Sequence, residues 1–233
     1  MSDDTKKIIA QLLLSFAAAY YAYKSSFIGS TLYDPIFGSI ELGGWYIPFT
    51  MFMIIAVVNS ANLTDGLDGL LSGVSLIYSI AMGVLFLYFA KVFDGSFINE
   101  PRFVANRDGM LCMSVFAFAV AGGCLGFLKS NSYPAKVFMG DTGSMALGGA
   151  MSAMVIYSRS PFLFLLMGVC IVASAVSVVL QVGSFKLRHG KRIFKMAPLH
   201  HHFELLGYPE TKVVSGYMIV TALACVAALA LFL

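Results

Sequence analysis

Seven stretches of the chain are almost free of charged residues, and this pattern constrains the fold more than any other feature. They cover residues 8–23, 44–60, 69–92, 110–128, 142–158, 162–183 and 214–233. A hydrocarbon core of about 30 Å is crossed by roughly 20 residues of helix, which satisfies its own backbone hydrogen bonds. Hydrophobic residues make up 59% of the 233 residues and charged residues 12%, more apolar surface than a soluble domain can bury. The sequence therefore predicts an all-α polytopic integral membrane protein, a single domain over 1–233 with about seven transmembrane helices.

The basic residues indicate how these helices are oriented. Seven crossings place the N-terminus and the segments near 61–68, 129–141 and 184–213 on one side. That side receives ten basic residues: Lys6, Lys7, Lys129, Lys136, Lys186, Arg188, Lys191, Arg192, Lys195 and Lys212. The other side receives five: Lys24, Lys91, Arg102, Arg107 and Arg159. Because Lys and Arg are enriched in cytoplasmic loops, the first side is predicted to be cytoplasmic.

The first polar stretch on that side, NSANLTDGLDGL, covers residues 59–70 between the second and third predicted helices. Asp65 and Asp68 are three residues apart, so they share a face in a helical turn. Asn62 adds an amide group, and Gly66 lets a ligand approach the backbone closely. Either aspartate alone could simply cap the following helix. Two carboxylates without a Lys or Arg in the same loop are costly at the membrane edge, which favours a functional role.

The second polar stretch, NSYPAKVFMGDTGSMALGG, covers residues 131–149. Asp141 directly precedes the fifth predicted helix and lies between Gly140 and a run of small residues. Such a turn can hold phosphate oxygens, and its carboxylate could hold a divalent metal that bridges them. An ordinary N-cap aspartate explains Asp141 equally well when it is considered alone. Phe138 could stack on a flat ligand or simply anchor the chain at the interface.

The third polar stretch, KLRHGKRIFKMAPLHHHFELLGYPETK, covers residues 186–212 and is strongly basic. It holds three of the four histidines of the chain in one run, His200, His201 and His202. Adjacent side chains on a helix diverge by about 100° each, so three adjacent histidines form a poor chelate for one metal ion. Imidazoles among cations are better suited to phosphate binding or proton transfer. The alternative is a solvated basic face that lies on anionic lipid.

All three stretches face the same compartment at the membrane edge. Enzymes of phosphoryl transfer combine acidic residues that hold Mg²⁺ with basic residues that hold phosphate. The position of these groups indicates that the second substrate resides in the membrane.

Together, NSANLTDGLDGL, FMGDTGSMALGG and KRIFKMAPLHHHFE closely resemble the phospho-N-acetylmuramoyl-pentapeptide-transferase family of the polyprenyl-phosphate N-acetylhexosamine-1-phosphate transferase superfamily. The resemblance implies Mg²⁺-dependent transfer of phospho-N-acetylmuramoyl-pentapeptide from UDP-N-acetylmuramoyl-pentapeptide to undecaprenyl phosphate. The products would be lipid I, used in peptidoglycan synthesis, and UMP. The resemblance also implies a bacterial inner (plasma) membrane location with a cytoplasmic active site. We expect no nucleic acid partner, and a homodimer is left open.

The same resemblance assigns roles to individual residues. The catalytic positions correspond to Asp65, His200, His201 and His202, and the Mg²⁺-binding position corresponds to Asp141. The substrate-binding positions correspond to Asn62, Asp68, Asn131 and Phe138.

The chain departs from the family pattern at its start. Family members have further helices before the helix that is first here, and an Asp-Asp-x-x-Lys motif precedes that helix. We therefore expect this chain to lack the N-terminal helices of the family. DDTKK, residues 3–7, satisfies the motif by its letters. The family places a longer basic loop after the motif, so we expect that Asp3 and Asp4 do not replace it and that the chain alone has little transferase activity.

Three other interpretations stay open at the level of sequence. The first is a related polyprenyl-phosphate sugar-1-phosphate transferase that uses another UDP-sugar. The second is a transporter or channel, in which intramembrane acids would line an ion path. The third is an inactive, shortened membrane protein. Acids placed at helix ends, with none at mid-membrane, favour a transferase over an ion path.

Overall fold

The computed structural model describes residues 3–34, 38–92 and 107–232. Its elements, in chain order, are α1 (Asp3–Lys24), β1 (Thr31–Asp34), β2 (Gly38–Glu41), the 3₁₀ turn η1 (Gly43–Trp45), α2 (Tyr46–Thr64), α3 (Leu70–Val92), α5 (Arg107–Asn131), α6 (Gly140–Ser158), α7 (Pro161–Met167), α8 (Val169–Leu187), α9 (Leu199–Leu205) and α10 (Glu210–Phe232). The expected all-α architecture is confirmed, with one short hairpin added.

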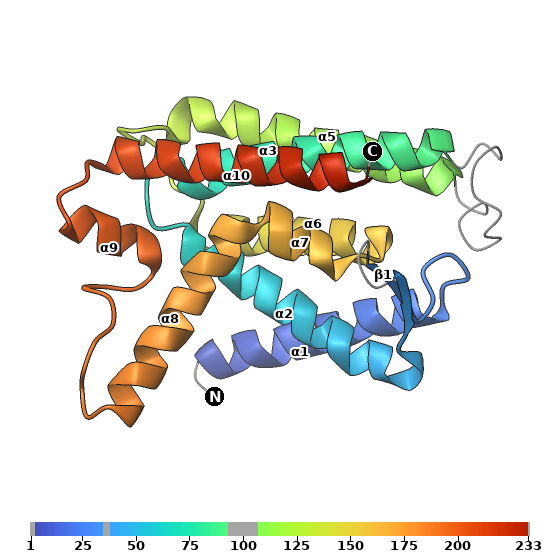
Figure 1. The fold of residues 1–233 in the computed structure, drawn as a ribbon, viewed down its shortest axis with the longest axis horizontal. Helices are drawn as coiled ribbons and strands as arrows, with labels where there is room; N and C mark the ends of the chain where they lie inside the picture. The colour runs from blue at the N-terminus through green and yellow to red at the C-terminus, as the bar shows by residue number, and fades with distance from the viewer. Residues whose placement is uncertain (1–2, 35–37, 93–106, 233) are drawn as a thin grey trace.

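The long helices run back and forth between the same two ends of a bundle (Figure 1). One end holds the start of α1, the turn 65–69 between α2 and α3, the segment 132–139 before α6, and α9. We call it the site end. The opposite end holds the β1–β2 hairpin and the C-terminal end of α10. The three polar stretches of the sequence therefore meet at one end of the molecule.

Helix α3 forms the centre of the bundle, packed against α5 and α10. Its fully buried side chains include Leu70, Leu71, Val74, Tyr78, Met82, Leu85 and Phe86. Small residues let α5 approach: the Ser114 hydroxyl donates to the carbonyl oxygen of Gly83 over 3.0 Å. Close packing of this kind holds helices together in a bilayer, where burial away from water adds little.

Helices α2 and α6 also approach each other closely, and this contact positions part of the site. A Cβ atom placed on Gly148 would lie 2.6 Å from the Cα of Val58, closer than two carbon atoms can pack. Glycine at this position therefore lets the two helix backbones touch. The contact brings the C-terminal end of α2 next to the N-terminal end of α6.

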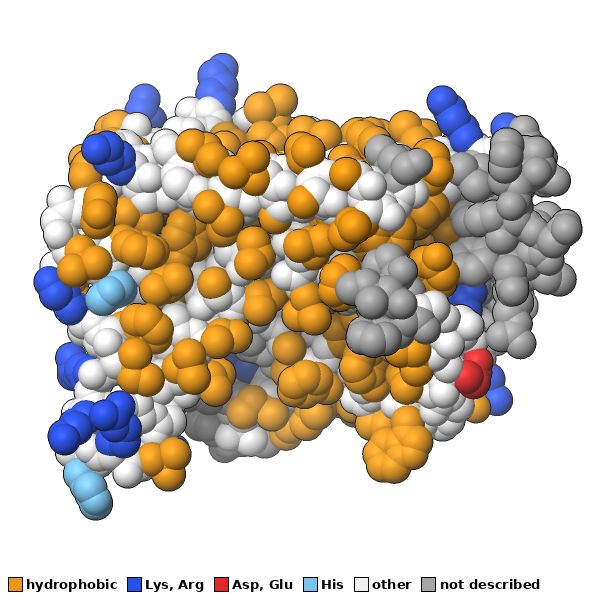
Figure 2. Space-filling view, viewed as in Figure 1, with side chains coloured by type: hydrophobic (Ala, Val, Ile, Leu, Met, Phe, Trp, Pro, Cys, Tyr) orange, Lys and Arg blue, Asp and Glu red, His pale blue; other side chains and the backbone are white. Residues whose placement is uncertain are grey.

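The surface has the distribution of polarity expected in a membrane. Figure 2 shows hydrophobic side chains over the middle of one face, with Lys and Arg side chains at its two ends. Among the described residues, five segments are long and apolar enough to cross a bilayer: Gly43–Thr64, Leu70–Lys91, Arg107–Asn131, Val169–Leu187 and Glu210–Phe232. Helices α1 and α6 lie where crossings are expected but are not among these five, so the count of seven crossings stays a prediction.

Two features differ from the sequence-based expectation. The single helix expected over 162–183 is interrupted at Gly168, between α7 and α8. A Cβ at Gly168 would lie 2.7 Å from the carbonyl oxygen of Phe164, so only glycine allows this tight junction. Beyond the junction, α8 leans away from the other helices (Figure 1). The antiparallel hairpin of β1 and β2 was not expected, because strands of four residues carry no clear periodicity.

Candidate functional site

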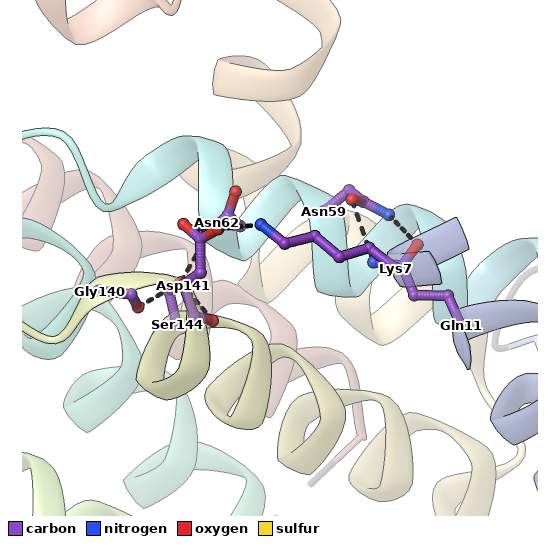
Figure 3. A network of polar contacts seen from close by, with 7 residues as sticks. All are labelled: Lys7, Gln11, Asn59, Asn62, Gly140, Asp141 and Ser144. Atoms are coloured by element: carbon purple, nitrogen blue, oxygen red, sulfur yellow. Dashed lines mark hydrogen bonds and ion pairs between the residues drawn. The ribbon is translucent and has the colours of Figure 1, made fainter. Parts of the chain in front are cut away.

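Asp141 lies at the start of α6 and is contacted from two other helices (Figure 3). Its Oδ2 atom accepts a hydrogen bond from the Nζ of Lys7 on α1 over 2.6 Å. Its Oδ1 atom accepts one from the Nδ2 of Asn62 on α2 over 3.2 Å, and the same amide donates to Ser144 over 2.9 Å. These hydrogen bonds and the charge of Lys7 lower the pKa of the Asp141 carboxyl group. Asp141 is therefore an ionised, solvent-exposed carboxylate that already attracts a cation.

Asp65 is a second carboxylate in the same region. It directly follows α2 and is half-buried. Its pKa is raised, first by desolvation and second by the negative charge of Asp141. The two carboxylates therefore repel each other, and a cation placed between them would relieve that repulsion.

Asp68 connects three segments of the site end. Its Oδ2 atom accepts a hydrogen bond from the backbone N–H of Ala135 over 2.8 Å. Its own backbone N–H donates to the Oε1 of Glu210, the first residue of α10, over 2.6 Å. The turn after α2, the segment before α6 and the start of α10 are thus held in one arrangement. Glu210 was not singled out from the sequence, because nothing in its surroundings predicts this long-range contact.

The two other expected substrate-binding residues lie in opposite environments. Asn131, at the end of α5, is buried, and its Oδ1 accepts from the Ser72 hydroxyl over 2.8 Å. Its Nδ2 donates to the carbonyl oxygen of Val137 over 3.0 Å. The side chain of Phe138 is 74% exposed. Asn131 therefore shapes the 132–139 segment from inside, and Phe138 presents a flat apolar surface outside.

His200, on α9, packs directly against the turn that follows α2. Its side chain is fully buried, and neither ring nitrogen has a hydrogen-bond partner in the described part of the chain. A Cβ atom at Gly66 would lie 2.3 Å from the Nε2 of His200, so only glycine leaves room for this ring. Burial, with a smaller contribution from His201, lowers the pKa of His200 to about 4. His200 is therefore a neutral imidazole against the turn that carries Asp65.

The other two histidines are held by different partners. The Nδ1 of His201 lies 2.6 Å from the Oε2 of Glu204, one turn later on α9. The Nδ1 of His202 accepts a hydrogen bond from the backbone N–H of Lys195 over 3.0 Å. A Cβ at Gly66 would lie 3.1 Å from the Nε2 of His201, so His201 also faces the turn after α2.

The described residues thus bring Asn62, Asp65, Asp141, His200 and His201 to one place, through the turn after α2. No group of three His, Cys, Asp or Glu side chains among the described residues is arranged to hold a metal ion by itself. A metal ion at Asp141 would therefore need ligands from a substrate or from water.

Comparison with known proteins identifies the family. The sequence profile described as glycosyl transferase family 4 matches residues 2–159. The chain belongs to glycosyl transferase family 4. The matched residues include Asn62, Asp65 and Asp141, so part of the site end lies within the family region, whereas α9 follows it.

The chain is also similar to individual proteins named phospho-N-acetylmuramoyl-pentapeptide-transferase. It is 48% identical to that of Clostridioides difficile over 229 residues, which is 97% of this chain and 65% of the relative. It is 45% identical to that of Clostridium novyi and 44% identical to that of Caldanaerobacter subterraneus, over 94% of this chain in each case and 62% and 63% of the relatives. The chain therefore spans slightly less than two thirds of the length of these relatives. This family 4 chain is a helical membrane protein whose sequence resembles theirs over nearly its whole length.

Proposed function

We propose that this protein transfers phospho-N-acetylmuramoyl-pentapeptide from UDP-N-acetylmuramoyl-pentapeptide to undecaprenyl phosphate, giving lipid I and UMP. The observation that supports this most is the meeting of Asp65, Asp141 and the α9 histidines at one end of an apolar bundle. Relatives that carry the name of this activity match nearly the whole chain. The reaction would take place at the cytoplasmic face of a bacterial inner membrane.

The side chains around Asp141 are compatible with Mg²⁺. This ion is usually held in proteins by one or two carboxylates, with phosphate oxygens and waters completing its octahedral shell. Asp141 is an exposed carboxylate that attracts the ammonium group of Lys7, and Asp65 contributes a second negative charge nearby. Asp141 would hold the ion, with the amide of Asn62 orienting its carboxylate. When bound there, Mg²⁺ would neutralise the charge of the diphosphate.

The proposed substrate-binding residues have two different roles, one in contacting the base and one in holding the segment that carries Phe138. Phe138 offers an exposed ring on which a uracil base could stack. Asp68 and Asn131 fix the segment that carries this ring, through Ala135 and Val137. The α9 histidines would lie near the phosphates, opposite the carboxylates across the turn after α2.

The lipid substrate needs an apolar path to the site end, and a cavity of about 540 Å³ lies between α8, α9 and α10. Its lining is almost entirely apolar and includes Phe203 and Tyr217, with Lys212 as its charged residue. A prenyl chain could occupy such a cavity while its phosphate stays at the membrane edge. The cavity borders α9, which carries the histidines.

A second donor specificity stays open, because the description of the matching family names no particular sugar. A relative of this kind would use UDP-N-acetylglucosamine in place of the muramoyl-pentapeptide donor. The two proposals share the site chemistry and differ only in the sugar.

Release of UMP tests the proposal and separates the two donors. The purified protein is incubated in detergent with undecaprenyl phosphate, Mg²⁺ and one UDP-sugar at a time. Because the chain alone is expected to have little transferase activity, we expect slow UMP release from UDP-N-acetylmuramoyl-pentapeptide and none from UDP-N-acetylglucosamine. The reverse preference would favour the second donor, and release from neither would contradict both. A transporter would release no UMP in this assay.

A further inference from the structure

The three adjacent histidines of α9 have three different hydrogen-bonding environments. His200 is buried without a partner among the described residues, His201 is paired with the carboxylate of Glu204, and His202 accepts from the backbone N–H of Lys195. Because a carboxylate only accepts and a backbone N–H only donates, the last two contacts decide which ring nitrogen carries the proton.

The carboxylate of Glu204 can only accept a hydrogen bond when it is ionised. The Nδ1 of His201 must therefore carry the proton at the 2.6 Å contact, and the Nε2 of the neutral ring has an unprotonated lone pair. A backbone N–H can only donate, so the Nδ1 of His202 is unprotonated and its proton lies on Nε2. Neighbouring histidines are thus held in opposite tautomers.

The lone pair of His201 faces the turn that carries Asp65. A Cβ atom built on Gly66 would lie 3.1 Å from the Nε2 of His201, and Gly66 is exposed to solvent. Glu204 is three residues later on α9, so it lies on the same side of the helix as His201. The pair keeps about a quarter to a third of each side chain exposed, at 26% for His201 and 32% for Glu204.

We propose that Glu204 is a positioning residue that fixes His201 in the Nδ1–H tautomer, so that its Nε2 acts as the proton acceptor at the turn after α2. The catalytic part of this proposal depends on the proposed transferase function. There, Nε2 accepts the proton of a P–OH group on the incoming lipid phosphate. The O–H bond breaks and an N–H bond forms. The oxygen keeps the electron pair with which it attacks the phosphorus atom that carries the sugar, and the bond from that phosphorus to the oxygen of UMP breaks, so that UMP leaves with the electron pair. The carboxylate of Glu204 then balances the charge of the imidazolium.

Nitrogen NMR of the histidine rings tests the tautomers directly. The chain contains four histidines, so ¹⁵N-histidine labelling of the 233-residue chain in detergent gives a spectrum of four rings. Long-range ¹H–¹⁵N correlations show which nitrogen of each ring carries a proton. Replacing one histidine at a time with asparagine assigns the signals. We expect Nδ1–H for His201 and Nε2–H for His202 in the neutral forms of the two rings.

Variants of Glu204 test its role as the positioning residue. Glu204→Met removes the acceptor while keeping side-chain length and helix propensity, and His201 should then shift to the Nε2–H tautomer that free histidine favours. Glu204→Gln keeps a neutral acceptor and should retain at least part of the Nδ1–H form. The signals of His189 and His202 serve as controls for folding and should not move. An Nε2–H tautomer of His201 in the unchanged protein, or an unaltered His201 spectrum in Glu204→Met, would overturn the proposal.

Turnover measurements test the catalytic part separately. Loss of a positioned base costs on the order of 10²-fold or more in rate. We expect Glu204→Met to lower kcat by about that factor, with little change in KM for the UDP-sugar, and Glu204→Gln to recover part of it. A kcat unchanged in Glu204→Met would contradict the role as proton acceptor. If the tautomers are as expected but the unchanged protein transfers no sugar phosphate, the proposed function fails and the assignment of Glu204 as the residue that orients His201 stands.

Discussion

The Nζ of Lys7 lies 2.6 Å from the Oδ2 of Asp141, although the two residues are 134 positions apart in the chain. The contact joins the first turns of α1 to the start of α6, and Asn62 on α2 contacts the other carboxylate oxygen. Three helices therefore converge on one carboxylate. A positive charge already lies where the proposed metal ion would bind.

Mg²⁺ should therefore compete with Lys7 for Asp141. Replacing Lys7 with methionine removes the competing charge and should tighten binding of a divalent ion. The ion pair is solvent-exposed and such pairs are weak, so the gain should be about fivefold or less. Asp141→Asn should remove the binding, because a hard cation prefers a charged oxygen ligand. Titration with Mn²⁺, followed by electron paramagnetic resonance, measures both effects.

Lys129 offers a matched control, because it is an exposed lysine at the end of α5, also at the site end. Lys129→Met should change Mn²⁺ affinity by less than Lys7→Met does. Weaker Mn²⁺ binding in Lys7→Met would show that Lys7 supports the metal site instead of competing with the ion.

The contact between α2 and α6 should be sensitive to one methyl group. Gly148→Ala places a Cβ 2.6 Å from the backbone of Val58, and such overpacking typically costs about 1–3 kcal/mol. We expect a lower thermal unfolding midpoint in detergent and weaker divalent-ion binding, because Asn62 and Asp141 move apart. Gly149→Ala, at the next position, meets no atom within 4 Å and should be neutral or slightly stabilising. Equal effects of the two substitutions would contradict the close approach of the helices at Gly148.

Asn131 and Phe138 should respond differently to substitution. Asn131→Ala leaves the Val137 carbonyl and the Ser72 hydroxyl without their buried partner, at a cost of roughly 2 kcal/mol, or a midpoint about 4–8 °C lower. Phe138→Ala removes an exposed ring and should leave the midpoint unchanged while weakening UMP binding, measured by calorimetry. A stability loss in Phe138→Ala similar to that in Asn131→Ala would show that the ring is structural.

Burial of neutral His200 should make the protein less stable in mild acid. Its pKa is about 4 in the folded protein, against 6.5 for a solvated histidine, so the unfolded chain binds an extra proton between these values. Stability is therefore complete above about pH 6.5 and falls as the pH is lowered towards 4, by up to roughly 3 kcal/mol. Thermal unfolding measured from pH 7 to pH 4 should show this decline, and His200→Leu should remove most of it.

Asp65 has the opposite effect on stability and favours the folded protein as the pH is lowered. Its raised pKa lets the folded protein keep a proton that the unfolded chain has lost. Asp65 is present in both the unchanged protein and His200→Leu. The difference between their stability profiles against pH therefore reports the contribution of His200. Identical pH dependence in the two proteins would contradict the burial of a neutral ring at position 200.

The sequence predicted the helices, and it identified the three polar stretches that meet at the site end, because both depend on local pattern. The apolar stretches place α2, α3, α5 and α10 within a few residues of their observed bounds. The carboxylates and histidines were recognisable by their type, their clustering and their resemblance to a known family. Their metal-binding, substrate-binding and catalytic roles stay predictions, as does the cytoplasmic side. The structure does not test the prediction that Asp3 and Asp4 do not replace the Asp-Asp-x-x-Lys motif, because their side chains lie outside the described residues.

The rest could not be predicted because it depends on contacts between distant segments. Nothing near Lys7 indicates that it meets Asp141, and nothing near Glu210 indicates that it accepts from the backbone of Asp68. The close fit of His200 against Gly66 depends on how α9 folds back on the bundle. The break at Gly168 depends on a backbone approach to Phe164 that a lone glycine in an apolar run does not reveal.

The most direct test of the central claim is transfer of label from the donor into lipid. The purified protein is incubated with undecaprenyl phosphate, Mg²⁺ and UDP-N-acetylmuramoyl-pentapeptide that is radiolabelled in its peptide. We expect label to enter the lipid fraction together with an equal amount of UMP, and chelation of Mg²⁺ or Asp141→Asn to abolish the transfer. Transfer that survives both treatments, or no transfer from this donor under conditions where UDP-N-acetylglucosamine is used, would contradict the proposed function.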